Sequence, residues 1–304
     1  MSLGVLGLLV SALILTILAT LKHRGSYSIV QSAKNLVELH GTSSTEALSI
    51  TSRSSLSPPQ CKVRDHSFEI LLVSPGGTGS SSGFDFFTTV MGLSPKDMND
   101  RGDKDGLKHM PFYSLFKTIS HCNLRVKALV YQFDDPVEAV YSLYRRGFAK
   151  MHYWKLEPVL HTEPEQCRFP DKHCTFQHCR FSDLKQNITS YARIGLDLLG
   201  MKNHLDSYVH GVVEECGIPV VFLKTSLRSS EQVMAKLPIL LDDLQIKRSS
   251  TGSNLSLSKY KRTSYKDDPS YENISSIYAS FNSKVLDALG ALAVAHEGYL
   301  LKLH

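Results

Sequence analysis

The sequence predicts an α/β fold with a doubly wound parallel sheet flanked by helices. Three short apolar runs have the length and composition of buried parallel strands: residues 68–73, 126–133 and 219–223. Helical patterns follow or separate them: residues 84–93, 137–146 and about 190–216. Strands that alternate with helices are typical of a parallel sheet. The composition, 42% apolar and 21% charged over 304 residues, suits one globular domain.

The first unit consists of a strand, a glycine-rich turn and a helix. After the apolar run 68–73, residues 74–82 read Ser-Pro-Gly-Gly-Thr-Gly-Ser-Ser-Ser. Such a P-loop-like turn exposes backbone N–H groups at the positive end of the helix dipole, which suits a phosphate or sulfate group. The candidate anion ligands are Gly77, Thr78, Gly79, Ser80, Ser81 and Ser82.

The end of this turn bears on the kind of nucleotide chemistry. A nucleotide triphosphatase loop ends in Gly-Lys-Ser or Gly-Lys-Thr, whereas Gly79 is followed by Ser80. The pattern therefore disfavours a kinase or an ATPase. The alternative is that residues 74–82 form a Gly/Ser-rich surface loop that binds no ligand.

The second unit begins with the strand 126–133. Asp134-Asp135-Pro136 follows it, and a helix is expected over 137–146. A proline is tolerated in the first turn of a helix, where its missing N–H would have no partner in any case. The third strand, 219–223, comes after the long helical pattern that starts near residue 190.

These units resemble the sulfotransferases that use 3'-phosphoadenosine 5'-phosphosulfate (PAPS), in their membrane-bound, carbohydrate-type branch. The family's first loop contains Ser-Gly-Thr-Thr, which residues 78–81 resemble, and its second motif places a Ser eight residues after an Arg that precedes Asp-Pro. Asp135-Pro136 and Ser142 keep that spacing. Residues 220–227 are similar to a later strand and loop, and residues 268–289, with Asn282, to the closing helix. The resemblance implies a PAPS-binding site.

Two cationic residues of the family pattern are missing. The loop lysine is replaced by Gly76 or Gly77, and the arginine of the second motif is replaced by Asp134. A carboxylate that faces a phosphate is repelled by about 1 kcal/mol per pair of unit charges at 4 Å in water. The cofactor's charge must then be met by other residues, and the candidates are Arg145, Arg146, Lys261 and Arg262.

Arg145 and Arg146 also have a plain structural interpretation. Cations near the C-terminus of a helix interact favourably with its dipole. The two arginines would then form a solvated helix end and bind nothing.

The resemblance implies transfer of a sulfuryl group to a hydroxyl or an amine of a glycan or another secretory-pathway acceptor. Such a reaction depends on positioning, on charge stabilisation and on a general base. Three residues are candidates for the base: His109 and His121, which lie between the two motifs, and Asp85, which lies just past the first loop. With thirteen histidines in the chain, a structural role for either histidine is the alternative.

The N-terminal part predicts a membrane anchor and a stem. Residues 1–24 have no charge before Lys22 and are long enough to span a bilayer as a signal-anchor helix. A cleaved signal peptide is the alternative, although a basic region before the apolar run is missing. Residues 25–60 are Ser/Thr-rich and read as a stem, and residues 61–304 as the sulfotransferase-like domain.

The orientation signals conflict. The basic cluster Lys22-His23-Arg24 follows the span, which by the positive-inside rule favours a cytosolic domain. Three glycosylation sequons, at Asn187, Asn254 and Asn273, and an even count of six cysteines favour a lumen. We expect a single-pass Golgi membrane protein with a luminal domain. The scattered net charge of +5 does not indicate a nucleic-acid partner.

A cluster of cysteines and histidines lies between the second and third strands. Cys167, Cys174 and Cys179 alternate with His173 and His178. In a lumen these cysteines are expected to form disulfides, whereas a cytosolic domain would allow zinc. Two other functions stay open: a catalytically inactive binding protein on the sulfotransferase fold, and a nucleotide-dependent kinase.

Overall fold

The computed structural model describes residues 27–32, 61–149, 152, 187–214, 217–249, 265–281, 285–296 and 299–303. These residues build one six-stranded sheet with the order β1-β6-β5-β4-β3-β2. The strands are β1 (Tyr27–Ser32), β2 (Ser67–Val73), β3 (Arg125–Phe133), β4 (Val220–Lys224), β5 (Leu292–His296) and β6 (Tyr299–Leu303).

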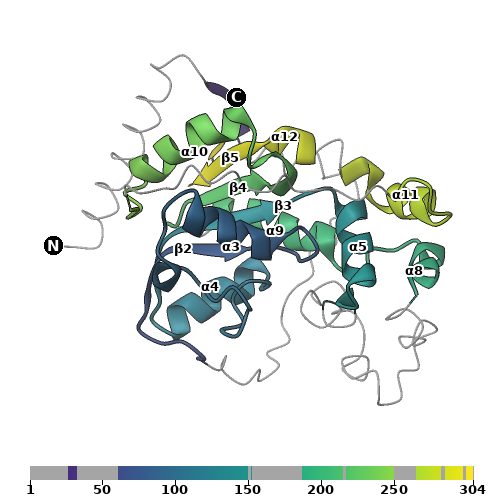
Figure 1. Ribbon diagram of the computed structural model, residues 1–304, viewed down its shortest axis with the longest axis horizontal. Helices are drawn as coiled ribbons and strands as arrows, with labels where there is room; N and C mark the ends of the chain where they lie inside the picture. The colour runs from purple at the N-terminus through teal and green to yellow at the C-terminus, as the bar shows by residue number, and fades with distance from the viewer. Residues whose placement is uncertain are drawn as a thin grey trace.

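Helices surround this sheet (Figure 1). The described helices are α3 (Ser80–Thr89), α4 (Phe112–His121), α5 (Pro136–Arg145), α8 (Ile188–Ile194), α9 (Met201–Glu214), α10 (Glu231–Asp243), α11 (Tyr271–Phe281) and α12 (Asp287–Leu289). The described residues also form two short 3₁₀ turns, η1 (Pro95–Asp97) and η3 (Thr225–Leu227).

The α/β class and the three predicted strands are confirmed. β2, β3 and β4 are parallel neighbours, with Leu71 opposite Leu129 and Tyr131 opposite Phe222. The other half of the sheet was not foreseen: β5, β6 and β1 each pair antiparallel with their neighbours. The sheet is therefore mixed, and its parallel part holds the carboxyl ends at which α/β proteins usually bind ligands.

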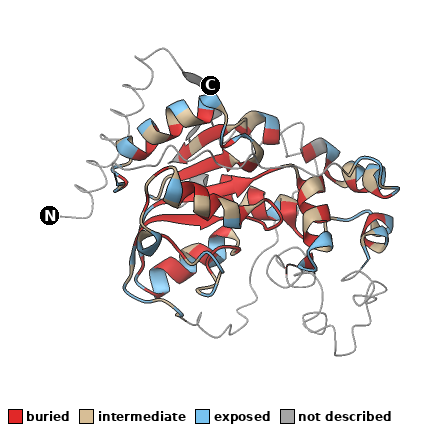
Figure 2. Cartoon of the chain, viewed as in Figure 1, coloured by how far each residue is buried: buried red, intermediate tan, exposed pale blue. Residues whose placement is uncertain are grey.

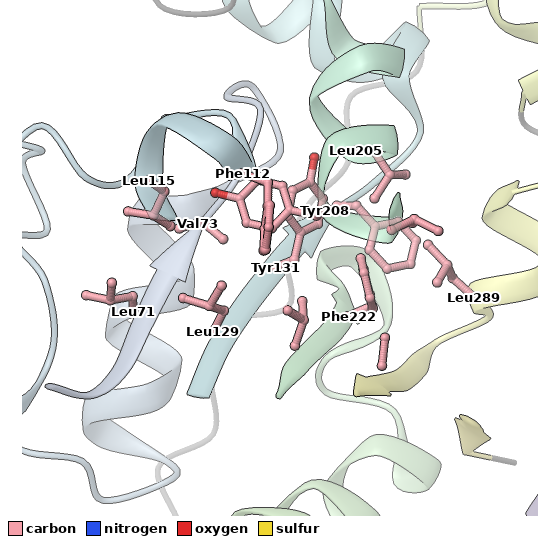
Figure 3. Packing of buried hydrophobic residues seen from close by; sticks show 14 of the residues in the cluster. Leu71, Val73, Phe112, Leu115, Leu129, Tyr131, Leu205, Tyr208, Phe222 and Leu289 are labelled. Atoms are coloured by element: carbon pink, nitrogen blue, oxygen red, sulfur yellow. The ribbon is translucent and has the colours of Figure 1, made fainter. Parts of the chain in front are cut away.

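Alternating side chains of the sheet bury two apolar layers, one on each face. On one face, Tyr131 and Phe222 pack against Phe112 of α4 and Tyr208 of α9 (Figure 3). On the other face, Val130 and Val221 pack with residues of α3 and α10. The strands are buried and the outer faces of the helices remain exposed (Figure 2). Burial on both faces explains the nearly continuous apolar runs of these strands.

A third apolar cluster lies beyond the carboxyl ends of the parallel strands. It joins α5, α8 and α11, which are grouped on one side of the molecule (Figure 1). Asp135 caps the N-terminus of α5 by accepting a hydrogen bond from the Val137 N–H at 2.9 Å, and Pro136 begins the helix. The helix that begins at this cap runs alongside the turn that follows β2, where Ala139 approaches Gly77.

Two further findings bear on the N-terminal part. A disulfide joins Cys61 to Cys122, which follows α4. β1 belongs to the segment 25–60 that the sequence assigns to a stem, and the boundaries of that segment stay a prediction.

Several predicted features lie outside the described residues: the anchor 1–24, the cluster of Cys167, Cys174 and Cys179, and Asn254 and Asn282. Within the described ranges, no helix has both the length and the apolar composition that a membrane crossing requires.

A buried histidine lies in the core between α9 and the sheet. His204 is 1% exposed, and its Nδ1 is hydrogen-bonded to the hydroxyl of Tyr131 at 2.9 Å. Burial lowers the pKa of His204 to about 3, because the imidazolium would lose its hydration. The side chain is therefore neutral at neutral and mildly acidic pH.

His204 is expected to make the stability of the protein fall on acidification. In the unfolded chain the imidazole binds a proton below about pH 6.5. The folded chain does not bind it until about pH 3. Between these two values the free energy of unfolding therefore falls by about 1.4 kcal/mol for each pH unit below 6.5. In His204→Gln this contribution is absent, so urea unfolding between pH 7 and 4.5 should show a shallower loss of stability than in the wild type. Parallel curves would contradict the assignment.

Candidate functional site

The glycine-rich turn connects β2 to α3 as the sequence predicts. Gly76, Gly77 and Gly79 have φ values of 92°, 73° and 81°, in the left-handed region that favours glycine. Gly79 is the N-cap residue of α3, and it offers no side-chain cap. No acidic residue occupies the first turn of the helix. The first N–H groups of α3 are therefore positioned to receive an anion from outside the chain.

The turn is only partly accessible. Residues 74–78 and Ser80 are buried, whereas Gly79 and Ser82 are half-buried and Ser81 is exposed. The Oγ1 of Thr78 is buried, and it has no hydrogen-bond partner among the described residues. Buried hydroxyl groups are normally hydrogen-bonded. The accessible part of the predicted anion site is thus the start of α3, with an unsatisfied hydroxyl just before it.

Two neighbours close on the glycines of the turn. A Cβ at Gly76 would lie 2.1 Å from Cε1 of His152. A Cβ at Gly77 would lie 2.3 Å from the backbone oxygen of Ala139 in α5. No side chain fits at either position without movement of these neighbours. A lysine at position 77 would meet the backbone of α5, whereas a lysine at position 76 would have to displace the ring of His152.

His109 lies against the beginning of the turn. Its Nδ1 is 2.8 Å from the carbonyl oxygen of Ser74. Because a carbonyl oxygen only accepts, Nδ1 carries the proton and donates it, and Nε2 of the neutral ring has the lone pair. Of the three candidate bases, His109 is the one that the structure brings to the turn. Its ring packs edge-to-face on that of His152, with centroids 4.8 Å apart.

The carboxylate of Asp134 is hydrogen-bonded within the protein. Its Oδ1 accepts hydrogen bonds from the Ser226 hydroxyl at 3.0 Å and from the Asp135 N–H at 2.9 Å. The side chain thereby ties the carboxyl end of β3 to the 3₁₀ turn after β4. This contact reduces the repulsion that the sequence implies for an anion at the site.

A cation that the sequence analysis missed lies beside the turn. Nη1 of Arg228 donates a hydrogen bond to the hydroxyl of Ser82 at 2.9 Å, and Arg228 is 4% exposed. Arg228 directly follows the segment 220–227 that resembles the family's later loop. A basic residue at the carboxyl end of a parallel strand was the available signal. Its guanidinium brings positive charge to the first turn of α3.

A second cation lies on the other side of α3. Lys108 is buried, and its Nζ lies 5.8 Å from the centroid of the Phe84 ring and donates to the carbonyl of Arg101 at 2.7 Å. The carbonyl of Lys108 accepts a hydrogen bond from the Ser74 N–H at 2.9 Å, so the residue also supports the turn.

Two of the predicted catalytic residues, Asp85 and His121, are not positioned to act at the turn. The carboxylate of Asp85 accepts two hydrogen bonds from Arg101, both at 3.0 Å, in a half-exposed ion pair. His121 is exposed at the end of α4, next to Cys122 and near the amino end of β3. The anion site is at the opposite, carboxyl end of that strand. The structure therefore does not bring His121 to the turn.

The predicted phosphate ligands of the second motif lie along α5. Ser142 lies one turn beyond Ala139 and hence on the side of α5 that faces the turn. Arg145 and Arg146 are exposed at the C-terminal end of the helix, where the Arg146 side chain donates to the Ser142 carbonyl at 3.1 Å. This geometry matches a solvated helix end. Lys261 and Arg262 lie outside the described residues.

Comparisons and local chemistry add no further ligand. No protein-family model matches the chain, and no curated protein or solved structure shows significant similarity to it. In the part of the chain that the structure describes, no three His, Cys, Asp or Glu side chains gather as a metal site would require. Two open clefts on the described surface, one beside Lys247 and one beside Lys62, are not lined by the turn.

Because α5 packs closely on the turn, two glycine variants are expected to lose different amounts of stability. Gly77→Ala introduces left-handed strain and a clash with Ala139, and it should cost about 2–4 kcal/mol of stability. Gly195→Ala is the matched control, because Gly195 has a φ of 69° but no atom within 4 Å of the added Cβ. That variant should lose about 1 kcal/mol. Urea unfolding of both variants measures the difference. Equal losses would mean that α5 does not press on Gly77.

Proposed function

We propose that this protein is a sulfotransferase that moves a sulfuryl group from PAPS to a hydroxyl or an amine of a glycan or another secretory-pathway acceptor. One observation carries the proposal. The uncapped first turn of α3 follows a left-handed glycine turn, and the guanidinium of Arg228 contacts that first turn through Ser82. Backbone donors at the positive end of a helix, with a cation beside them, form a site for a phosphate or sulfate group.

The residues present are compatible with the 5'-phosphosulfate end of PAPS. Backbone N–H groups of Ser80, Ser81 and Ser82 would hold its oxygens, and Arg228 would supply the charge that the family pattern places elsewhere. The unsatisfied hydroxyl of Thr78 offers one more donor at the edge of this site. We assign Ser142, on the side of α5 that faces the turn, to the 3'-phosphate.

The chemistry assigned to the protein is proton removal and charge stabilisation. The acceptor oxygen attacks sulfur, a new S–O bond forms, and the bond between sulfur and the 5'-phosphate oxygen breaks, so that adenosine 3',5'-bisphosphate leaves with the electron pair. Nε2 of His109 takes the acceptor's proton, since Nδ1 is already committed as a donor to Ser74. The donors at the start of α3 stabilise the charge on the transferred group.

The finer features of the fold belong to the same proposal. The β2–turn–α3 unit supports a P-loop-like architecture, and helices on both faces of the sheet support a doubly wound arrangement. We assign the domain to the Golgi lumen behind a single membrane span. The Cys61–Cys122 disulfide and the exposed sequon residues Asn187 and Asn273 support that location.

A second candidate function is a binding protein that has lost catalysis. The absence of a lysine at positions 76 and 77 favours it, since that lysine bridges the sulfate and the leaving phosphate in the family. Both candidates require the nucleotide to bind. They differ in whether PAPS is turned over.

The test is calorimetric titration of the full-length chain in detergent with adenosine 3',5'-bisphosphate. We expect binding that weakens about tenfold or more in Arg228→Gln, because a hydrogen bond to a charged group contributes about 1.5–3 kcal/mol. Ser81→Ala should weaken it about threefold. Arg125→Gln is the matched control, because Arg125 is exposed at the amino end of β3.

Two results would contradict the proposal. Absence of binding by a folded chain with its disulfides intact would exclude the nucleotide site. Binding that depends on Mg²⁺ and prefers a nucleoside triphosphate would indicate a kinase. The double variant Arg145→Ala/Arg146→Ala tests the other cations: a larger loss there than in Arg228→Gln would place the phosphate charge at the end of α5.

A further inference from the structure

His152 fills the space that a side chain at position 76 would take. The added Cβ of Gly76 would lie 2.1 Å from Cε1, 2.4 Å from Nδ1 and 2.9 Å from Nε2 of His152. The whole imidazole thus covers the left-handed Gly76. At Gly77, by contrast, a backbone carbonyl closes the space. A nitrogen-bearing ring from a distant segment therefore stands beside Gly76, one of the two positions at which the sulfotransferase pattern can place its lysine.

Contacts on two sides hold His152 there. Its backbone N–H donates to the carbonyl of Phe148, four residues earlier, at 3.1 Å. Its ring meets that of His109 at an interplanar angle of 75°. Both rings are less than a tenth exposed. Two imidazoles, one bonded to Ser74 and one packed on Gly76, therefore lie side by side on the same turn.

The two rings suit two different tasks. Sulfuryl transfer requires a base for the acceptor's proton and a donor for the oxygen that carries the leaving negative charge. The hydrogen bond to Ser74 fixes His109 as the ring whose Nε2 accepts. The other task falls to a donor on the glycine side of the turn, where positions 76 and 77 carry no lysine.

We infer that His152 is a second catalytic residue, which donates an imidazole N–H to the oxygen between sulfur and the 5'-phosphate of PAPS. This inference rests on the proposed function and deepens it. As the S–O bond to that oxygen breaks, the electron pair stays on adenosine 3',5'-bisphosphate, and the N–H of His152 stabilises it. The acceptor's proton goes to His109, so His152 exchanges no proton. His152 thereby takes over the role of the absent lysine.

The product keeps the oxygen that His152 contacts, so the affinity for adenosine 3',5'-bisphosphate reports the hydrogen bond directly. The experiment is calorimetric titration of the full-length wild type, His152→Phe and His152→Gln with this nucleotide. Phenylalanine keeps the ring that covers Gly76 but removes both nitrogens. Glutamine loses the ring but places an amide N–H near the position of Nε2. A donor role and a packing role therefore predict opposite orders of affinity.

We expect His152→Phe to bind about tenfold or more weakly than the wild type, and His152→Gln to retain much of the affinity. The same substitutions at His66, at the amino end of β2, serve as the control and should leave the affinity unchanged. Unchanged affinity in His152→Phe, or a loss in His152→Gln that equals or exceeds it, would overturn the inference and leave the proposed function standing. A wild type that does not bind the nucleotide would overturn both.

Discussion

The close approach of α5 to the glycine turn is the constraint on which the candidate site depends. The carbonyl of Ala139 occupies the space beside Gly77, and His152, carried by the chain that leaves α5, occupies the space beside Gly76. Only glycine satisfies both the left-handed backbone and these neighbours. The turn therefore cannot move as a loose surface loop. Its shape is set by the packing of α5 with α8 and α11, which lies at the carboxyl end of the sheet.

This constraint also explains how the charges are distributed. In a turn with room for side chains, a lysine could supply the cation locally. Here the cation beside the first turn of α3 comes from outside the turn, from Arg228 after β4. The carboxylate at position 134 is tolerated nearby because the Ser226 hydroxyl and a backbone N–H bind it. A site assembled in this way depends on the relative positions of three strands and not on one short motif.

The sequence predicted those parts of the fold that depend on local patterns. Apolar runs identified β2, β3 and β4, and the glycine turn identified the start of α3. β5 and β6 escaped notice because they lie in residues 292–303, where a short apolar stretch beside a helical pattern is ambiguous. For the candidate site, its position between two motifs singled out His109, which lies against the beginning of the turn. Arg228 and His152 could not be identified from the sequence, because each acts through a contact with a residue far away in the chain. Arg228 contacts Ser82, which is 146 positions away, and His152 covers Gly76, which is 76 positions away.

The pairing of β1 with β6 has a consequence for how the protein would stand on a membrane. If residues 1–24 form the span, only residues 25 and 26 separate it from β1, and two residues extend over at most about 7 Å. The sheet would then be held almost at the bilayer surface by the strand that forms its edge. The turn after β2 lies at the other edge, five strand spacings or about 24 Å away. On the proposed function, the distance of the site from the bilayer would be limited by the width of the sheet and not by the length of a flexible tether.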